Sequence, residues 1–562
     1  MIIRDDTQPD TNNNGSTPGL ISQLRWSYLP PLMVYLAAGV SGLTAIVGTF
    51  FVKEYLGLPA TFLAGLAFWA GIPWVLKMPM GHLVDLIWRW KFALVYFGAS
   101  LISLSILIMY GLIAHTDRLI VFFPLEKWFV TATLLAPVGY VIQDVVADAM
   151  TVEAVPDRDE NGKQFTEGQT KAMHTTMQTL GRIAIIGGFL FVAALNVFMF
   201  SDVESLNNEE KIQIYSDIYL IAFAIPIISI AGVTFGQILI RKRANILRTQ
   251  GVDEIQIDRI LFRSSENIQP DWRIFGGSAI FVVFTLFMGV GNFSYGQEII
   301  FAGSMMIVLF LMFRLIRHLE TDAALMLMGT AVIIFVFRAT PSPGAGAIWF
   351  EIDVLGFDQQ FLSVLSLITS CLTLVGMILL RPLMATKSIA MIVVLLTIAA
   401  GLLSLPNIGL FYGIHIWTSS WTNGIVDARF IAVLDTAIES PLGQIAMIPM
   451  LAWIAKNAPV SLKATFFAVM ASFTNLALSA SALATKYLNK IYTVTREVKD
   501  PLSGEITTTA NYDELGMLLI TTTLVIVILP LTAVLFVQNS RIRTSQRQFK
   551  WLYATRHRPK FN

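Results

Sequence analysis

Apolar residues occur along this chain in blocks of about 20, and short clusters of charged residues separate the blocks. A helix of about 20 apolar residues crosses the hydrocarbon core of a bilayer and pairs its own backbone polar groups there. The pattern therefore predicts an all-α polytopic membrane protein with about 14 spans. The spans are expected at residues 29–52, 60–80, 91–114, 128–150, 174–199, 216–240, 273–293, 298–316, 321–341, 359–380, 387–405, 429–453, 463–485 and 515–538.

The spacing of the blocks groups the spans as six, two and six. Two six-helix halves joined by a linker are typical of secondary transporters. Within the linker, the apolar spacing of 251–272 predicts a short amphipathic helix on the membrane surface. The organisation that follows is a disordered cytoplasmic tail at 1–28, an N-terminal six-helix bundle at 29–240, a cytoplasmic linker at 241–272, an inserted helix pair at 273–316, a C-terminal six-helix bundle at 317–540 and a basic cytoplasmic tail at 541–562.

Composition supports the membrane class and excludes several others. Only 14% of the residues are charged and 55% are hydrophobic, whereas a soluble protein carries about 25% charged residues. The net charge of +1 gives no indication of nucleic-acid binding. Cys371 is the single cysteine, so an intramolecular disulfide and a zinc cluster are both excluded. We expect no cofactor, and the polar N-terminal tail lacks the apolar core of a signal peptide.

The distribution of lysine and arginine predicts the orientation of the chain. With the N-terminus inside, most basic residues of the short loops fall on the inner side, as the positive-inside rule requires. The loop at 486–513, outside by this count, mixes both signs and is an exception. Both termini are then cytoplasmic, and the expected location is the cell membrane, either an inner or a plasma membrane.

The span at 128–150 carries two carboxylates at membrane depth, Asp144 and Asp148. Their four-residue spacing places both on one helix face. A charge facing lipid costs several kcal/mol, so both must face a bundle interior or a water-filled cavity. Two interpretations stay open: a transport role, as substrate ligand or proton carrier, and a structural ion pair with Lys77 or Arg182.

The stretch GIPWVLKMPMGHLVDLIWRWK, from Gly71 to Lys91, ends in the loop after the second span. It resembles the signature loop of the major facilitator superfamily, in which a glycine opens a turn and an aspartate and basic residues latch neighbouring helices. The resemblance implies that a conformational latch is formed by Gly81, Asp85, Arg89 and Lys91. The alternative is an ordinary positive-inside loop.

Further stretches narrow the resemblance: QDVVADAMTVE, FRATPSPGAGAIWFEIDVLGFDQQFLSVLSL, NGIVDARFIAVLDTAI and MIPMLAWIAKNAPVSLKATFFAVMASFTNLA. Together with PWVLK, they are similar in kind and order to motifs of the folate–biopterin transporter family, a branch of that superfamily. The similarity covers about residues 29–240 and 321–490. One departure is Met78, where the family usually has proline after the motif lysine.

The resemblance implies import of a folate- or pterin-like anion, coupled to a proton or another ion. A carboxylate suits the paired N–H donors of a pterin ring, which assigns Asp144 or Asp148 to the ring. The two carboxylates of a folate tail need cations, for which Arg338 and Arg182 are candidates. Gln178, one turn before Arg182, is a further candidate for this site.

Other polar residues within spans have weaker assignments. Lys77 either joins the substrate site or extends its amine to the interface. Asp435 lies inside an apolar run and shares a helix face with Glu439, so we include it in the substrate or proton site. Asn475 is expected to make an interhelical hydrogen bond, and Trp349 is expected in an interfacial aromatic belt rather than stacked on substrate.

Two other functions stay open at this stage. The D-x-x-x-D-A pattern of the fourth span is also similar to that of muropeptide permeases and acetyl-CoA transporters, which implies another solute in the same fold. A non-transporting receptor or assembly factor is a second alternative, although it would gain nothing from charges inside spans. An enzyme is not expected, because no nucleophile–base pair or metal-binding constellation lies at membrane depth.

Overall fold

The computed structural model describes most of the 562-residue chain. The described residues are 25–51, 58–75, 87–155, 167–201, 207–262, 295–317, 321–380, 387–440, 463–499 and 506–542, with isolated positions between 77 and 84 and between 280 and 293. The predicted N-terminal tail, most of the span at 273–293 and the second half of the span at 429–453 lie outside them.

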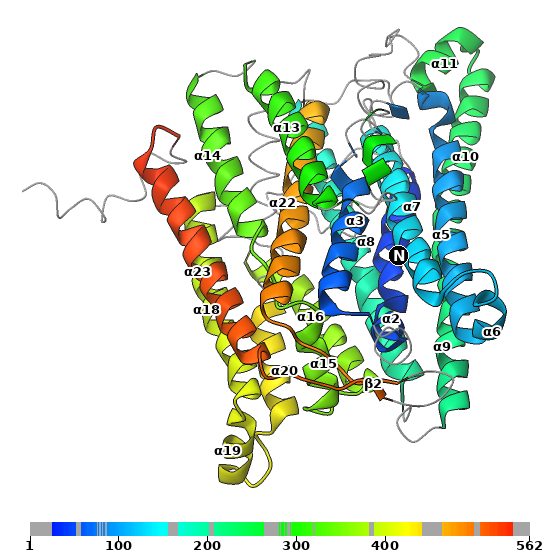
Figure 1. Cartoon of the computed structure of the whole chain (residues 1–562). Helices are drawn as coiled ribbons and strands as arrows, with labels where there is room; N and C mark the ends of the chain where they lie inside the picture. The colour runs from blue at the N-terminus through cyan, green and yellow to red at the C-terminus, as the bar shows by residue number, and fades with distance from the viewer. Residues whose placement is uncertain are drawn as a thin grey trace, which may run out of the picture. The chain divides into compact units, whose positions relative to one another are not determined.

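Helices account for nearly all of the described structure, as predicted (Figure 1). Eight described helices are long and apolar enough to span a membrane, and three shorter apolar helices accompany them. The exception is a small antiparallel hairpin between β1 (Val498–Lys499) and β2 (Ile506–Thr508), in the loop before the last span. The prediction of an all-α polytopic membrane protein is confirmed, whereas the count of 14 spans stays a prediction.

Contacts divide the chain into two compact units. Unit 1 consists of Met1–Leu56, Leu76–Leu286 and Asp358–Ser370, and unit 2 of Gly57–Val75, Phe287–Phe357 and Cys371–Asn562. The second predicted span therefore groups with the later part of the chain, because α3 (Ala60–Val75) packs along α22 (Lys463–Ile491). The predicted boundaries of the two six-helix bundles stay predictions.

Unit 1 is built on the first helices of the chain. Its described elements are η2 (Trp26–Tyr28), α1 (Leu29–Val40), η3 (Ser41–Thr44), α2 (Ala45–Phe51), η5 (Trp88–Trp90), α5 (Lys91–Ala114), α6 (Thr116–Leu119), α7 (Leu125–Ala154), α8 (Glu167–Met199), α9 (Asn208–Ala222), α10 (Ala224–Thr249), α11 (Glu254–Phe262) and the start of α16 (Gln359–Leu379). Helix α1 packs against α7, α8 and α10, and α5 packs against α7. The linker helix predicted at the membrane surface corresponds to α11.

Glycines set the closest of these approaches. A Cβ on Gly39 of α1 would lie 2.1 Å from the Ile185 carbonyl oxygen, and one on Gly188 of α8 would lie 2.7 Å from the Gly39 Cα. Because lipid offers no hydrophobic driving force between helices, such close packing of small residues is a main source of helix association in membranes. The contact fixes α1 against α8, and both helices carry residues of the site described below.

Unit 2 contains the remaining described helices and the hairpin. Besides α3, α22, β1 and β2, they are α13 (Gly296–Ile316), α14 (Thr321–Arg338), α15 (Ala345–Asp353), the end of α16, α18 (Ile389–Phe411), α19 (Ile414–Trp421), α20 (Ala428–Glu439) and α23 (Leu515–Asn539). Helix α18 packs against α14, α20 and α23. The break between α14 and α15 follows Arg338 and contains Pro341 and Pro343, which lack the N–H that a continuing helix needs.

The second helix of the predicted inserted pair, α13, is held by polar contacts within unit 2. Lys486 of α22 pairs with Glu298 at 3.3 Å and donates to Gln297 at 2.8 Å. The Gln297 amide donates in turn to the Gly65 carbonyl of α3 at 3.1 Å, and the Tyr487 hydroxyl donates to Glu298 at 2.6 Å. The start of α13 is therefore bonded to both α3 and α22.

The interfacial position predicted for Trp349 is wrong. Its side chain is only 2% exposed, and the Arg496 guanidinium lies over its ring at 5.2 Å from the ring centroid. The loop that carries Arg496 precedes the hairpin and covers this end of α15, which sequence periodicity could not indicate. The short helices α6 and α19 lie outside the predicted spans.

We expect Gly188→Ala to lower the free energy of unfolding by about 1–3 kcal/mol, because the added methyl group overpacks the contact between α1 and α8. Gly187→Ala is the matched control, since a Cβ at Gly187 meets nothing within 4 Å and replacing a helical glycine adds about 0.5–1 kcal/mol of stability. Thermal unfolding of both purified variants in detergent measures the difference. Equal midpoints would contradict the assigned contact.

Candidate functional site

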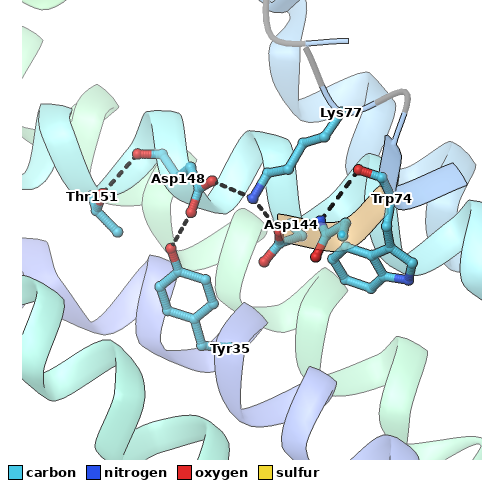
Figure 2. A network of polar contacts seen from close by, with 7 residues as sticks. Tyr35, Trp74, Lys77, Asp144, Asp148 and Thr151 are labelled. Carbon is cyan, nitrogen blue, oxygen red and sulfur yellow. Dashed lines mark hydrogen bonds and ion pairs between the residues drawn. The ribbon is translucent and has the colours of Figure 1, made fainter. Parts of the chain in front are cut away.

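The conspicuous polar cluster of unit 1 forms around α7. Asp144 and Asp148 lie one turn apart on this helix, as their spacing predicted, and both point toward the Lys77 amine (Figure 2). The Lys77 Nζ lies 2.5 Å from Asp144 Oδ2 and 2.6 Å from Asp148 Oδ2. Of the two predicted arrangements for Lys77, the structure therefore contains the inward one: the amine is bonded between two carboxylates and does not extend to the interface.

A tyrosine that the sequence analysis missed completes the cluster. The Tyr35 hydroxyl of α1 donates to Asp148 Oδ1 at 2.6 Å (Figure 2). Its ring lies against α8, where a Cβ on Gly181 would lie 2.9 Å from the ring. Nothing in the spacing of Tyr35 within an apolar span distinguishes it from a packing residue. The absence of a side chain at Gly181 was the only available signal, and it is interpretable only once α1 and α8 are known to touch.

The two carboxylates differ in their exposure to solvent. The Asp144 side chain is 17% exposed and the Asp148 side chain is 48% exposed, while that of Lys77 is 16% exposed. Asp148 is also held through its backbone, because its carbonyl accepts from the Thr151 hydroxyl at 2.7 Å. Asp148 is therefore the member of the cluster that a solute reaches most directly.

Arg182, one of the two arginines predicted to pair with an anionic solute, interacts electrostatically with this cluster. Arg182 of α8 is half-buried and lies close enough to Asp144 and Tyr35 for its charge to act on both. The backbone at Gln178 belongs to the same helix, one turn earlier, and the structure does not describe its side chain. Lys77, Asp144, Asp148 and Arg182 thus form one group within unit 1, with two positive and two negative side chains.

The remaining predicted site residues belong to unit 2. Arg338 is half-buried at the last position of α14, where the chain leaves the helix before Pro341. Asp435 is buried on α20 and accepts a hydrogen bond from the Asn407 amide at 3.2 Å. The assignment of both residues to a substrate site stays a prediction.

Other polar residues of unit 2 have structural partners. The Asn475 amide of α22 donates to the Trp74 carbonyl of α3 at 3.3 Å (Figure 2), so the predicted interhelical hydrogen bond is confirmed. Asp427 precedes α20, and its side chain accepts from the Phe430 N–H at 2.8 Å. This contact makes Asp427 the N-cap of the helix.

The predicted latch is described only in part. Gly81 and Asp85 lie outside the described residues. Arg89 is exposed and pairs with Asp258 of α11 at 3.4 Å. Lys91, by contrast, is 1% exposed and pairs with Glu153 near the end of α7 at 2.8 Å. The basic residues of the loop therefore connect it to α11 and α7.

Metal chemistry finds no support in the described part of the chain. Among those residues, no group of three histidine, cysteine or acidic side chains is arranged to hold a metal ion. The cluster on α7 combines hydrogen-bond acceptors with positive charges. It offers carboxylate oxygens to N–H donors, and it contains two cations that suit an anionic solute.

Known proteins resemble the chain in sequence and fold. The sequence model of the BT1 family matches residues 282–548. A folate-biopterin transporter of Synechocystis sp. is 32% identical over 146 residues, which cover 26% of this chain and 28% of that relative's length.

Solved structures share the fold. A POT family transporter in complex with 5-aminolevulinic acid has a TM-score of 0.58 at 12% identity, over 91% of this chain and 95% of its own. A peptide transporter POT in complex with sulfate has a TM-score of 0.56 at 14% identity, covering 93% and 96%. The nucleoside transporter NupG has a TM-score of 0.52 at 10% identity, covering 91% and 99%. The chain therefore has the fold of these transporters, and residues 282–548 of its sequence are similar to the BT1 family.

Proposed function

We propose that the chain is a secondary active transporter that imports a folate- or pterin-like organic anion by alternating access, coupled to protons. The observation that supports this most directly is the Lys77 amine held between Asp144 and Asp148 at membrane depth. The match of residues 282–548 to the BT1 family and the partial similarity to a folate-biopterin transporter favour the same solute class. In this proposal the protein lies in the cell membrane with both termini in the cytoplasm.

The charges of the cluster favour a binding role over a purely structural one. Taking an ion out of water costs several kcal/mol, and an ion pair in a low-dielectric interior recovers this only with good geometry and further hydrogen bonds. Apolar residues of similar size would join the helices at least as well. The half-exposed Asp148 indicates that the cluster is instead retained to meet a polar solute.

Recognition of the ring follows from donor and acceptor geometry. A pterin presents an amino group beside a ring N–H, and a carboxylate accepts both in parallel. Asp148 is the better placed of the two aspartates because it is more exposed than Asp144. A pterin bound there would compete with the Lys77 amine and the Tyr35 hydroxyl for the same oxygens. The Lys77 amine would then leave Asp148 and stay paired with Asp144. This change of partner would link solute binding to the position of α7.

Recognition of the acidic tail requires cations. Arg182 of α8 belongs to the same cluster as Asp148, and its guanidinium suits a carboxylate bidentately. Arg338 is a second candidate, at the helix break of unit 2. We assign the buried pair between Lys91 and Glu153 to the conformational cycle rather than to solute binding, because it lies at the predicted latch.

We expect Lys77→Met to lower the free energy of unfolding by about 3–5 kcal/mol, because two carboxylates would be left together without their cation. Tyr35→Phe removes one hydrogen bond to a charged group and should cost less, about 1.5–3 kcal/mol. Lys127→Met, at an exposed position near the start of α7, is the matched control. Thermal unfolding in detergent ranks the three variants.

Neutralising the two aspartates tests whether unpaired charge causes the loss of stability in Lys77→Met. Lys77→Met combined with Asp144→Asn and Asp148→Asn should recover most of the stability lost by Lys77→Met alone, since no unpaired charge is left. If Lys77→Met is as stable as Lys127→Met, the two aspartates are not both charged in the native protein, and the assignment of the ion pair is wrong.

Uptake of labelled folic acid into vesicles that contain the purified protein tests the function. We expect saturable uptake driven by an inward proton gradient, and a loss of about 10²-fold or more with Asp148→Asn, which removes one of the two oxygens that a pterin would engage bidentately. Asp117→Asn, in the short helix α6, is the control with an unchanged signal.

Competition separates recognition of the ring from recognition of the tail. An unlabelled simple pterin should inhibit folic acid uptake if Asp148 binds the ring, and should fail to inhibit if the tail dominates. Folded protein that accumulates no folic acid under any gradient would contradict the proposed solute and would favour another solute class in the same fold.

A further inference from the structure

Unit 2 contains a second group of acidic side chains, and its environment differs from that of the cluster on α7. Asp435 lies on the face of α20 that also carries the buried Ala428 and Ala432. Their spacing places the three on one stripe of the helix, and α20 packs against α18. The aspartate therefore occupies a packing position, and the residues that precede it on the same stripe are alanines.

The hydrogen bonding of Asp435 is incomplete. The side chain is 8% exposed, and its Oδ2 accepts from the Asn407 amide at 3.2 Å. Its Oδ1 is buried and has no hydrogen-bond partner among the described residues. A buried carboxylate in this situation costs far more as an anion than as a neutral acid, which carries its own hydrogen. The unpartnered Oδ1 therefore indicates that this carboxyl group binds a ligand, because the described helices direct no polar group at that oxygen.

The nearby charged groups are acidic. Glu351 of α15 lies close enough to Asp435 for their charges to repel, and Glu439 follows Asp435 by one turn on α20. Arg429, on the same helix, donates to the Gly356 carbonyl at 3.0 Å. The titratable residue of α19, His415, shows no interaction with this group in the described structure. No cation acts on these acids among the described residues, and carboxylates that repel one another without a cation cannot all ionise easily.

We propose that Asp435 and Glu351 form the proton-binding site that couples transport to the proton gradient. This inference rests on the proposed function, and it assigns solute binding to unit 1 and proton binding to unit 2. The cluster on α7 pairs its carboxylates with cations and binds the solute, whereas the acidic pair of unit 2 has no cation partner among the described residues and binds a proton. A metal cation fits less well, because hard cations take six or more oxygen ligands and Asn407 directs its amide nitrogen at Asp435.

Infrared difference spectroscopy of the purified protein in lipid vesicles tests the site without any transported solute. Spectra recorded between acidic and alkaline pH should contain the carbonyl band of a protonated carboxylic acid that titrates. Asp435→Asn should remove this band, and Glu351→Gln should shift its midpoint. Asp322→Asn, an exposed acid at the start of α14, should leave it unchanged. A band that persists in Asp435→Asn would overturn the proposal.

Transport of labelled folic acid gives the second measurement. At zero membrane potential, one pH unit supports about tenfold accumulation per coupled proton. Asp435→Asn should lose this accumulation and keep exchange of labelled for unlabelled folic acid at equal pH. Full accumulation in that variant, or accumulation driven by sodium and not by protons, would overturn the proposal.

The two measurements test the proposed solute and the proton site independently of each other. If the wild-type protein carries no folic acid, the proposed solute is wrong, and the infrared band still decides whether Asp435 binds a proton. If Asp435→Asn does not fold, as judged by gel filtration, Glu351→Gln and Asp435→Glu take its place. Glu351→Gln should then weaken accumulation, and Asp435→Glu should retain part of it. Full accumulation in Glu351→Gln together with no accumulation in Asp435→Glu would count against the pair.

Discussion

The cost of burying charge in a membrane protein governs this structure. An isolated ion at membrane depth is costly, and the chain meets that cost in unit 1 by surrounding the Lys77 amine with Asp144 and Asp148 at 2.5 and 2.6 Å. The Tyr35 hydroxyl also donates a hydrogen bond to Asp148, and the positive charge of Arg182 acts on Asp144. Because each member stabilises the others, the cluster also fixes the side chains that face one another from α1, α7 and α8.

Close packing of small residues makes this arrangement possible. Gly39 and Gly188 bring α1 and α8 into backbone contact, and Gly181 leaves room for the Tyr35 ring on the same side of α8. A larger residue at any of the three positions would move Tyr35 away from Asp148 or Arg182 away from Asp144. The polar site is therefore positioned by apolar packing, as is common in membrane proteins, where polar contacts alone contribute about 1–2 kcal/mol each.

The two units solve the problem of buried acids in different ways. In unit 1 the acids have cations, and in the described part of unit 2 Asp435 has the Asn407 amide and an acidic neighbour. A carboxylate that is already paired with a cation holds its charge through a cycle, while an unpaired one favours the neutral form and can exchange a proton. This contrast is the physical basis of the proposal that solute and proton bind to separate groups.

The sequence alone determined the class of the protein, because the length and periodicity of apolar blocks are set by the bilayer and do not depend on tertiary contacts. The predicted span at 91–114 has the bounds of α5, and the span that carries Asp144 and Asp148 differs from α7 by only a few residues. The spacing of the two aspartates on one face was an equally local property. The partners of these residues were not local. That Lys77 pairs with both aspartates, that Tyr35 completes the cluster and that Trp349 lies buried beneath Arg496 depend on which helices touch. Those contacts join residues far apart in the chain, and only the tertiary structure decided them, because helix spacing specifies a face and not its neighbour.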